Sequence, residues 1–398
     1  MASSETKIPV NPAILRWARE DAGISLEDAA ARAKISAIKA TSKTPAQTPA
    51  ERLQKIESGE ASITATIFSA LAKLYRRPEI TFFLSKPPRK ENLLADFRTV
   101  NSQISDKDSP EFSALKRYII NLHKGLKDIV AENGGEPIPF VGSVSSESSV
   151  ASIVSRVHEI LGEDPRQNKV RDEDDFFSKL REQIQDAGVY VVLAGNLGSH
   201  HSNVSLEEFR GICIADPVAP LIVINPNDTL RARIFSLLHE FCHILLGISG
   251  VFNDAGVTAV VHSRAHEKLC NAVAAEYLVP ASQLCILAEG EISETDIKEL
   301  AKKFRVSAFV IARRLLDLGR ITKEEYERLT NIYIFQSRQT KARTSDAGGP
   351  NANIIARSHL GNKLIQTVWG AATSGQIAFT DASTLLGISA SRLDKVCV

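Results

Sequence analysis

Apolar residues recur at helical spacing along the start of the chain. Ile14, Leu15 and Ala18 lie on one helical stripe that ends before Gly23. Ser25 with Asp28 is close to the pattern of an N-terminal capping box. Helical runs follow at ERLQKIESG and IFSALAKLYRR, after the polar stretch TSKTPAQTP. The pattern predicts a compact helical unit over residues 1–90.

The pattern changes near the middle of the chain. Helices are expected between Asp108 and Glu132 and over residues 151–187. Three short runs rich in β-branched residues then read as strands: GVYVVLAG, FRGICIAD and APLIVIN. Further helices are expected from about Thr229 to Leu246 and from about Arg264 to Leu278.

The tail from residue 291 is mostly helical in pattern, with a break at the polar, Gly- and Pro-containing run 338–353. Together these segments predict a multidomain chain. The expected parts are a helical domain at 1–90, a helical connector at 91–150, an α+β region at 151–290, a helical region at 291–337 and a C-terminal helical tail at 338–398.

Composition and charge narrow the class of protein. The 398 residues are 43% hydrophobic and 24% charged, which excludes disordered, collagenous and coiled-coil classes. The chain has no apolar run of about 18 residues and no secretory signal pattern. Its five cysteines form no CxxC pair and are expected to be buried free thiols. We therefore expect a cytoplasmic protein without a membrane partner.

Charge is unevenly distributed. The chain has 48 Lys and Arg against 47 Asp and Glu, so a wholly basic nucleic-acid binder is excluded. Residues 1–90 nevertheless carry 15 Lys and Arg against 9 Asp and Glu, a net charge of +6, which leaves −5 for the remainder. A local basic domain that binds DNA is therefore compatible with the sequence.

The sharpest chemical signal is the pattern H-E-x-x-H at 239–243. Residues four apart share one helical face, so His239 and His243 can bind one metal ion, and Glu240 beside them can accept a proton from water. The flanking residues are apolar and Gly247 ends the run, which predicts a buried helix. Two histidines and a glutamate on a buried helix are costly to satisfy without an ion.

A catalytic zinc needs a third protein ligand and an open position. The next predicted helix offers Glu267, with Asn271 on the same face to orient a ligand histidine. Glu276 is the runner-up for the third ligand, and His262 and His266 are the other two candidates in this region. His262 and His266 are also four apart, but solvent exposure is the favoured interpretation for both, as it is for His200 and His201.

A zinc site of this kind would activate water for attack on a peptide carbonyl, with Glu240 as general base. The run FRGICIAD is the expected edge strand that takes an extended substrate. Tyr277, His262 and Arg264 remain alternatives for stabilising the oxyanion.

The blocks FRGICIAD, APLIVINP, IFSLLHEFCHILLG and EKLCNAVAAEYLVP, in this order and spacing, resemble the ImmA/IrrE metallopeptidase family. The N-terminal part resembles the Xre-type helix-turn-helix domain, through LRWARE, GISLEDAA, LQKIESGE and LAKLYRRPEITFFLSKPP. The C-terminal run from GGPNANII resembles the tail of the long members. The resemblance implies an all-α helix-turn-helix domain before an α+β minimal thermolysin-like (gluzincin) core.

The resemblance further implies Zn²⁺ held by His239, His243 and Glu267. It also implies a substrate: a helix-turn-helix repressor, cleaved to release transcription of mobile-element or stress genes. The N-terminal domain departs from the family pattern, because Ser36–Thr48 reads as an insertion before the presumed recognition helix. The alternative to DNA binding is therefore a module that pairs with a related repressor domain.

If the domain binds DNA, the candidates for groove contacts are Thr48, Arg52, Gln54 and Lys55. The candidates for phosphate contacts are Arg16, Arg19, Lys34, Lys73, Arg76 and Arg77. A second helix-turn-helix-like pattern spans 297–319, but its many apolar positions favour helix packing over DNA contact.

The sequence thus favours a zinc endopeptidase whose partners are a repressor substrate and DNA. Two other functions remain open. One is a DNA-binding regulator whose zinc site is not catalytic, and the other is an antitoxin-like protein that binds the toxin of a neighbouring gene.

Overall fold

The computed structural model describes residues 7–38, 45–75, 77, 79–87, 109–167, 170–196, 203–252, 261–288, 292–341 and 351–398. The chain forms two compact units. Unit 1 comprises Met1–Leu94 with Ile104–Tyr118, and unit 2 comprises Ala95–Gln103 with Ile119–Val398.

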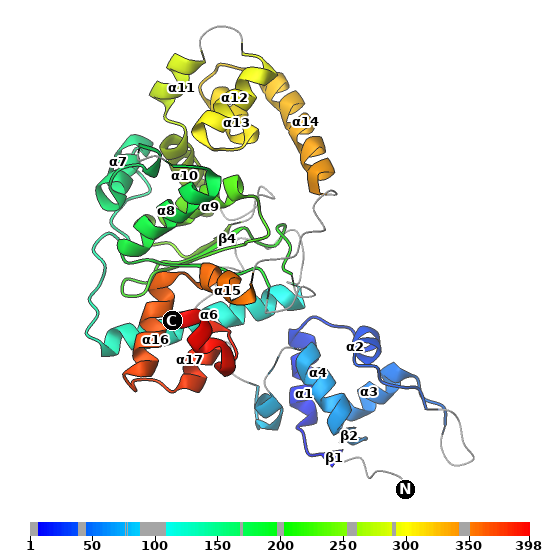
Figure 1. Ribbon diagram of the computed structural model, residues 1–398. Coiled ribbons are helices and arrows are strands. Elements are labelled where there is room, and N and C mark those ends of the chain that lie inside the picture. Colours follow the sequence, from blue (N-terminus) through cyan, green and yellow to red (C-terminus); the bar gives the residue numbers. More distant parts are fainter. Residues whose placement is uncertain are drawn as a thin grey trace. The chain divides into compact units, whose positions relative to one another are not determined.

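Unit 1 is built from short capped helices (Figure 1). Each of the first four begins after a residue whose side chain accepts a backbone N–H, namely Asn11, Ser25, Thr48 and Thr64. Its elements are β1 (Lys7–Ile8), α1 (Pro12–Asp21), α2 (Leu26–Arg32), α3 (Pro49–Glu57), β2 (Ile63–Thr64), α4 (Ala65–Leu74) and the 3₁₀ turn η1 (Glu79–Phe83). β1 and β2 pair antiparallel, and the apolar faces of the helices form one core.

The connection between α2 and α3 contains an antiparallel bridge. Ile38 and Gln47 exchange two backbone hydrogen bonds of 2.9 Å each. Arg52 of α3 donates to the backbone oxygen of Ser36 at 3.3 Å, at the start of the same connection. The segment that the sequence marks as an insertion thus contacts itself and α3, while residues 39–44 lie outside the described residues.

Unit 2 is mostly helical around a small sheet. The strands are β3 (Tyr190–Leu193), β4 (Gly211–Ile214), β5 (Leu221–Ile224) and β6 (Gly250–Phe252), in the order β3-β5-β4-β6. β3 is parallel to β5, and the other neighbours are antiparallel. The three strands expected from apolar runs are present, and β6 was not expected.

The expectation that FRGICIAD forms an edge strand is wrong. β4, which comes from this run, pairs with β5 on one side and with β6 on the other. The sequence pattern finds a strand but does not reveal its neighbours, and the short β6 is what covers the edge of β4.

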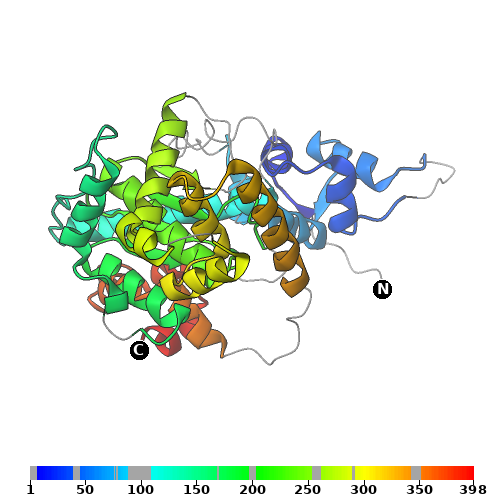
Figure 2. The same cartoon turned by 90° about the horizontal axis from the view of Figure 1, so that it is seen from above.

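Helices cover both faces of the sheet (Figure 1). α7 (Val150–Leu161), α8 (Glu173–Asp186), α9 (Leu230–Leu246) and α10 (Val261–Leu278) lie on one side, and Figure 2 shows this layer from above. α6 (Pro110–Glu132), which belongs to unit 2 from Ile119, lies on the other side with the C-terminal helices. A short 3₁₀ turn, η3 (Pro165–Gln167), joins α7 to α8.

The region after α10 continues the same core. Its helices are α11 (Ala281–Leu287), α12 (Glu294–Phe304), α13 (Ala308–Asp317) and α14 (Lys323–Lys341). The helix-turn-helix-like pattern at 297–319 corresponds to α12 and α13. Ile297, Phe304, Ile311 and Leu315 from these helices are buried in the cluster that also contains α9 residues. The apolar positions of this pattern are therefore used for helix packing.

The C-terminal helices are α15 (Ala352–Leu360), α16 (Asn362–Thr373), α17 (Phe379–Leu386) and α18 (Leu393–Cys397), with the 3₁₀ turn η5 (Ala390–Arg392) before α18. α15 and α16 contact β3. The guanidinium of Arg181 on α8 links these parts. It donates to the carbonyls of Val191 at 2.6 Å, Ser358 at 2.5 Å and His359 at 3.0 Å. Burial lowers the pKa of Arg181 to about 10.

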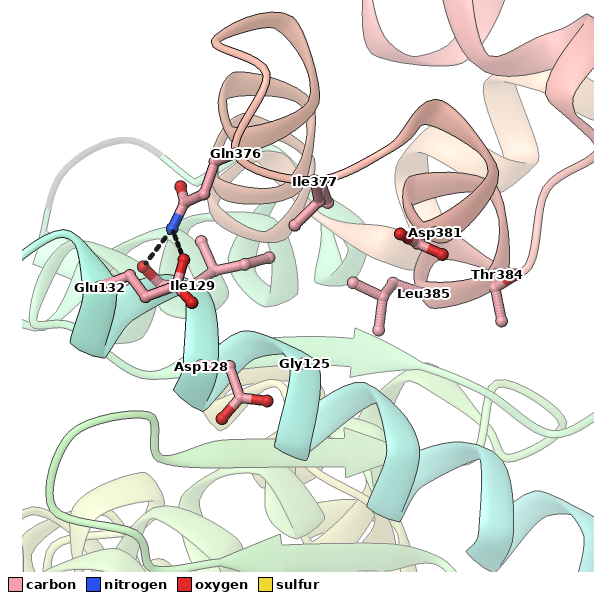
Figure 3. A pocket seen from close by; sticks show the side chains of 9 residues that line it. All are labelled: Gly125, Asp128, Ile129, Glu132, Gln376, Ile377, Asp381, Thr384 and Leu385. Atoms are coloured by element: carbon pink, nitrogen blue, oxygen red, sulfur yellow. Dashed lines mark hydrogen bonds between the residues drawn. The ribbon is translucent and has the colours of Figure 1, made fainter.

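A groove of about 350 Å³ lies between α6 and the C-terminal helices (Figure 3). Gln376 donates across it to Glu132 at 2.9 Å and to the backbone oxygen of Ile129 at 3.2 Å. Its lining residues are Gly125, Asp128, Ile129, Glu132, Gln376, Ile377, Asp381, Thr384 and Leu385. This groove contains no histidine or cysteine.

All five cysteines are free. Cys213, Cys242, Cys270 and Cys397 are buried as expected, but Cys285 on α11 is exposed, so the expectation is wrong there. Within the described ranges, no single helix has the length and hydropathy needed to cross a bilayer. One bent pair, Ala265–Leu278 with Ala281–Leu287, meets these criteria by length and composition only.

Candidate metal centre

The motif 239–243 lies in the middle of α9, which is almost entirely buried. The helix begins after Thr229, whose side chain caps it, and ends at Gly247 in the left-handed region with φ 69°. Between these ends the residues are nearly all uncharged, so the helix packs against the sheet on one side and α10 on the other. His239 and His243 are 0% and 3% exposed.

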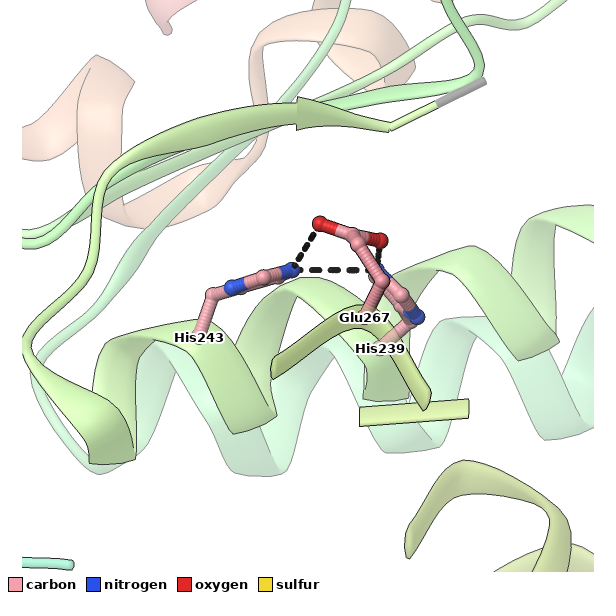
Figure 4. A group of neighbouring side chains, drawn as sticks. All are labelled: His239, His243 and Glu267. Atoms are coloured by element: carbon pink, nitrogen blue, oxygen red, sulfur yellow. Dashed lines mark hydrogen bonds and ion pairs between the residues drawn. The ribbon is translucent and has the colours of Figure 1, made fainter. Parts of the chain in front are cut away.

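The two histidines and one glutamate converge at one point (Figure 4). Nε2 of His239 and Nε2 of His243 lie 3.1 Å apart. Glu267 comes from α10, and its two carboxylate oxygens lie 3.2 Å from Nε2 of His239 and 3.2 Å from Nε2 of His243. One ligand atom from each residue lies within 4.8 Å of the others. We call these three residues the metal triplet.

The metal triplet has the donor set of a transition-metal site. Two imidazole nitrogens and a carboxylate oxygen suit such an ion, and they face one another from two helices. Burial by itself would raise the pKa of Glu267, but hydrogen bonds and charge from the two histidines outweigh it and hold that pKa well below its usual range. Nδ1 of His243 is buried without a hydrogen-bond partner among the described residues. The residues present therefore fit a metal ion.

Asn271 orients one ligand. Its Oδ1 lies 3.0 Å from Nδ1 of His239, so the amide oxygen accepts a hydrogen bond from that ring nitrogen. This contact assigns the proton of the neutral ring to Nδ1. The lone pair of Nε2 is then directed at the point where the ring of His239 meets His243 and Glu267. Burial is the main cause that lowers the pKa of His239, which favours the neutral ligand form.

Glu240 is enclosed beside the triplet. Its side chain is 1% exposed, and neither carboxylate oxygen has a hydrogen-bond partner among the described residues. Burial, and then the nearby negative charge of Glu267, raise the pKa of Glu240 well above its usual range. A buried carboxyl that accepts no hydrogen bond from the described residues, next to a metal triplet, is suited to proton transfer.

The structure separates the two candidate glutamates of α10. Glu276 forms an ion pair with Arg314 of α13 and accepts a hydrogen bond from the backbone N–H of Ala281 at 3.2 Å. It therefore lies outside the metal triplet. His266 is half-buried and also outside it. The side chain of His262, and residues 200 and 201, lie outside the described residues.

Among the oxyanion candidates, Tyr277 is placed away from the triplet. Its ring is 1% exposed and stacks on His158 of α7 at a centroid distance of 4.8 Å. The helical rise of about 1.5 Å per residue separates it from Glu267 by several turns of α10. The other two candidates, Arg264 and His262, have side chains outside the described residues.

Of the candidates for groove contacts in unit 1, two make contacts within the unit and two are at least partly exposed to solvent. Thr48 is the N-cap of α3, and its hydroxyl accepts the backbone N–H of Glu51 at 3.2 Å. Arg52 contacts Ser36, whereas Gln54 is exposed and Lys55 is half-exposed.

Some candidates for phosphate contacts are likewise paired with carboxylates, and others are exposed. Arg19 is paired with Glu57 at 2.8 Å, Arg77 is paired with Asp21 and stacked on Trp17, and Arg16 is paired with Glu20 on the surface. Lys34 and Lys73 are exposed, and Arg76 lies outside the described residues.

Sequence reasoning did not single out Gly211, the first residue of β4, although it lies against Glu240. A glycine inside a strand pattern is a known signal of close backbone approach, so the run FRGICIAD did contain a clue.

Comparison with known protein families gives a match, and it covers the region of the metal triplet. Residues 184–316 match the family model described as the IrrE N-terminal-like domain (Peptidase_M78). This range contains the sheet, α9 and α10, and therefore the whole metal triplet. The match supports the resemblance to the ImmA/IrrE family for this part of the chain and points to a peptidase. No curated protein matches the chain in sequence.

Proposed function

We propose that the protein is a zinc-dependent endopeptidase that cleaves a helix-turn-helix transcriptional repressor. The observation that carries this proposal is the metal triplet of His239, His243 and Glu267, with the enclosed carboxyl of Glu240 beside it. The family match over residues 184–316 supports a peptidase of the IrrE kind. The repressor substrate rests on the resemblance to the ImmA/IrrE family.

His239, His243 and Glu267 would hold the zinc ion, and three protein ligands leave a position open for water or substrate. Bound zinc would supply Lewis acidity, which polarises both the attacking water and the scissile carbonyl. Asn271 keeps the ring of His239 in the tautomer that a ligand needs.

Glu240 performs the proton transfers. Its carboxylate accepts a proton from the attacking water while the oxygen forms a bond to the scissile carbonyl carbon. It then delivers that proton to the leaving nitrogen as the C–N bond breaks. Both of its oxygens are free of other hydrogen bonds within the described residues, so no protein contact has to break first.

We further propose that unit 1 is an Xre-type helix-turn-helix domain that binds DNA and brings the peptidase to its substrate. The helices α1 to α4 share one core, and α3 has Gln54 exposed and Lys55 half-exposed, which supports this assignment. Lys34 and Lys73 are the candidates for phosphate contacts that have no carboxylate partner among the ion pairs described.

The decisive experiment compares the wild-type chain with Glu240→Gln. Each is incubated with the repressor encoded nearest to its gene, with and without a chelator, and zinc content is measured in parallel. We expect the wild type to cleave and the chelator to stop it. Glu240→Gln should keep zinc but cleave more slowly by roughly 100-fold or more, because glutamine cannot accept the proton.

Glu182→Gln is the matched control, because Glu182 is an exposed glutamate of the same unit. It should cleave like the wild type. Full cleavage, or full release of the target gene in cells, by zinc-replete Glu240→Gln would contradict the proposal. That outcome would favour a DNA-binding regulator or an antitoxin-like protein with a non-catalytic zinc site.

A further inference from the structure

The backbone of β4 passes unusually close to Glu240. An ideal Cβ on Gly211 would lie 2.8 Å from both Cγ and Cδ of Glu240, and closer still to its Oε1. Real Cβ atoms essentially never approach a heavy atom within 3.0 Å. The contact involves the stem of the side chain as well as its tip, so a residue other than glycine could not be accommodated by moving the carboxylate end of Glu240 alone.

Space, and not backbone conformation, makes glycine necessary at this position. Gly211 does not have a positive φ, so its backbone is open to ordinary residues. It is paired in the middle of the sheet, opposite Ile224 on β5 and Phe252 on β6. β4 therefore cannot retreat from α9 without breaking the pairing on both sides.

The same face of β4 is packed tightly along its length. Residues two apart in a strand share a face, so Cys213 points to the same side as Gly211. Cys213 is 0% exposed, and its Sγ donates to the backbone oxygen of Ile248 at 3.7 Å, just beyond the end of α9. Glu240, itself 1% exposed, is enclosed between this face and its own helix.

We propose that Gly211 is a positioning residue for Glu240. The missing side chain on β4 reserves the space that the stem of Glu240 occupies, and this fixes the direction of the carboxylate beside His239 and Glu267. The catalytic consequence rests on the proposed function, in which Glu240 is the general base. The steric relation between Gly211 and Glu240 does not rest on it.

The chain offers a matched control in Gly250. This glycine lies on β6, pairs with Cys213 of β4, and also lacks a positive φ. A Cβ on Gly250 would meet nothing within 4 Å. Gly211→Ala and Gly250→Ala thus make the same chemical change on neighbouring strands of one sheet, and differ in whether Glu240 is in the way.

The first test is a double-mutant cycle in denaturant unfolding of the full chain. Gly211→Ala should lower the unfolding midpoint, and most of that loss should disappear in the Glu240→Ala background, where the space is vacant. Gly250→Ala should have the same small effect in both backgrounds. An equal loss for Gly211→Ala in both backgrounds would overturn the proposal.

If Gly211→Ala does not fold, the double variant Gly211→Ala with Glu240→Ala gives the answer. Recovery of folding supports the steric relation, and failure to recover refutes it. Neither measurement depends on peptidase activity, so a wild type that cleaves nothing would refute the proposed function and leave this result standing.

The second test measures cleavage of the repressor encoded nearest to the gene. Gly211→Ala should bind zinc like the wild type and keep KM, while kcat falls by roughly 100-fold, the scale expected when a reacting group is misplaced by about 1 Å. Gly250→Ala should retain wild-type kcat. If the kcat of Gly211→Ala equals that of Gly250→Ala, Gly211 does not position Glu240 for catalysis.

Discussion

Glu267 and Glu276 belong to the same helix, yet their carboxylates meet opposite kinds of partner. Glu267 faces the imidazoles of His239 and His243 on α9, the two residues with which it would hold a metal ion. Glu276 is neutralised by Arg314, a residue that is 9% exposed. The first glutamate is therefore expected to matter for metal binding, and the second for the stability of the fold.

Glu267→Ala should lower zinc affinity by more than the roughly 10–100-fold that outer partners of a ligand contribute, because it removes a ligand itself. Glu276→Ala should keep zinc and lose stability, since it leaves a buried arginine without its counter-charge. Zinc content after dialysis, together with a thermal melt, checks both outcomes. Zinc loss in Glu276→Ala combined with retention in Glu267→Ala would reverse the assignment.

At the scale of elements, two contacts between distant segments hold unit 2 together. One is the guanidinium of Arg181, which joins α8 to β3 and to the end of α15. Its acceptors are backbone carbonyls. The other joins α6 to the turn after β4, where Lys127 pairs with Asp216 at 2.7 Å and His123 lies 3.7 Å from the same carboxylate.

Arg181→Met should destabilise the chain by about 2–4 kcal/mol, because charged hydrogen bonds are lost and buried carbonyls of β3 and α15 are left without a donor. A denaturant titration measures this. Arg156→Met is the control, since Arg156 forms an exposed pair with Glu159 at 2.8 Å and its loss should matter by less than about 0.5 kcal/mol. Equal losses in the two variants would show that Arg181 does not anchor the C-terminal helices.

The contribution of His123 to the stability of unit 2 should fall as the pH falls from neutral to mildly acidic. Burial lowers the pKa of His123, and this outweighs the opposing effect of Asp216. The unfolded state then binds a proton more readily than the folded state. The contribution of neutral His123 to the free energy of unfolding is therefore complete above about pH 6.5, and it is lost as the pH falls toward the pKa of His123 in the folded state. The pKa of Asp216 is also lowered, but its contribution disappears only below about pH 3.9.

Unfolding midpoints at about pH 7.5 and about pH 5.5 test this prediction. His123→Gln should show a smaller difference between the two midpoints than the wild type. Part of the difference should remain, because burial also lowers the pKa of His359 on α15. An unchanged difference in His123→Gln would exclude His123 as a source of the pH dependence.

An element could be predicted from the sequence where local residues determine it, and could not where contacts between remote segments do. Helices with a capping residue and a long apolar stripe were expected close to where they occur, as with Ser25 before α2 and Gly247 after α9. β6 was missed because three residues are too few to show an alternating pattern. The order of the strands, and the pairing of Glu276 with Arg314, depend on contacts between remote segments, which no local pattern records.

At the scale of the whole molecule, positive charge is concentrated in residues 1–90, but much of it is already paired. Arg19 and Arg77 form ion pairs with Glu57 and Asp21 within unit 1. The cations open to a nucleic acid are therefore fewer than the 15 Lys and Arg of this segment, although its net charge stays at +6. Lys55 and Lys73 are two of the other cations, and they are the positions where DNA contact can be tested.

The full chain should bind duplex DNA with an affinity that falls steeply as salt rises. Lys55→Ala and Lys73→Ala should each reduce the slope of log affinity against log salt by about 1. Lys298→Ala is the control, because Lys298 lies on α12 of unit 2 and pairs with Glu294 at 2.6 Å. Absence of binding even at low salt would favour the alternative in which unit 1 pairs with a repressor domain.

The long connection between α2 and α3 has a practical consequence. Closing a flexible loop costs only about 0.6 kcal/mol more for each doubling of its length, which is no more than a single helix cap contributes. The positions of α2 and α3 are set by their shared core and by the capping box of Thr48 and Glu51, which do not depend on that length. Pro45 and Ala46, which are exposed and directly precede Gln47 of the bridge, are thus a suitable place to insert an epitope tag or a fluorophore.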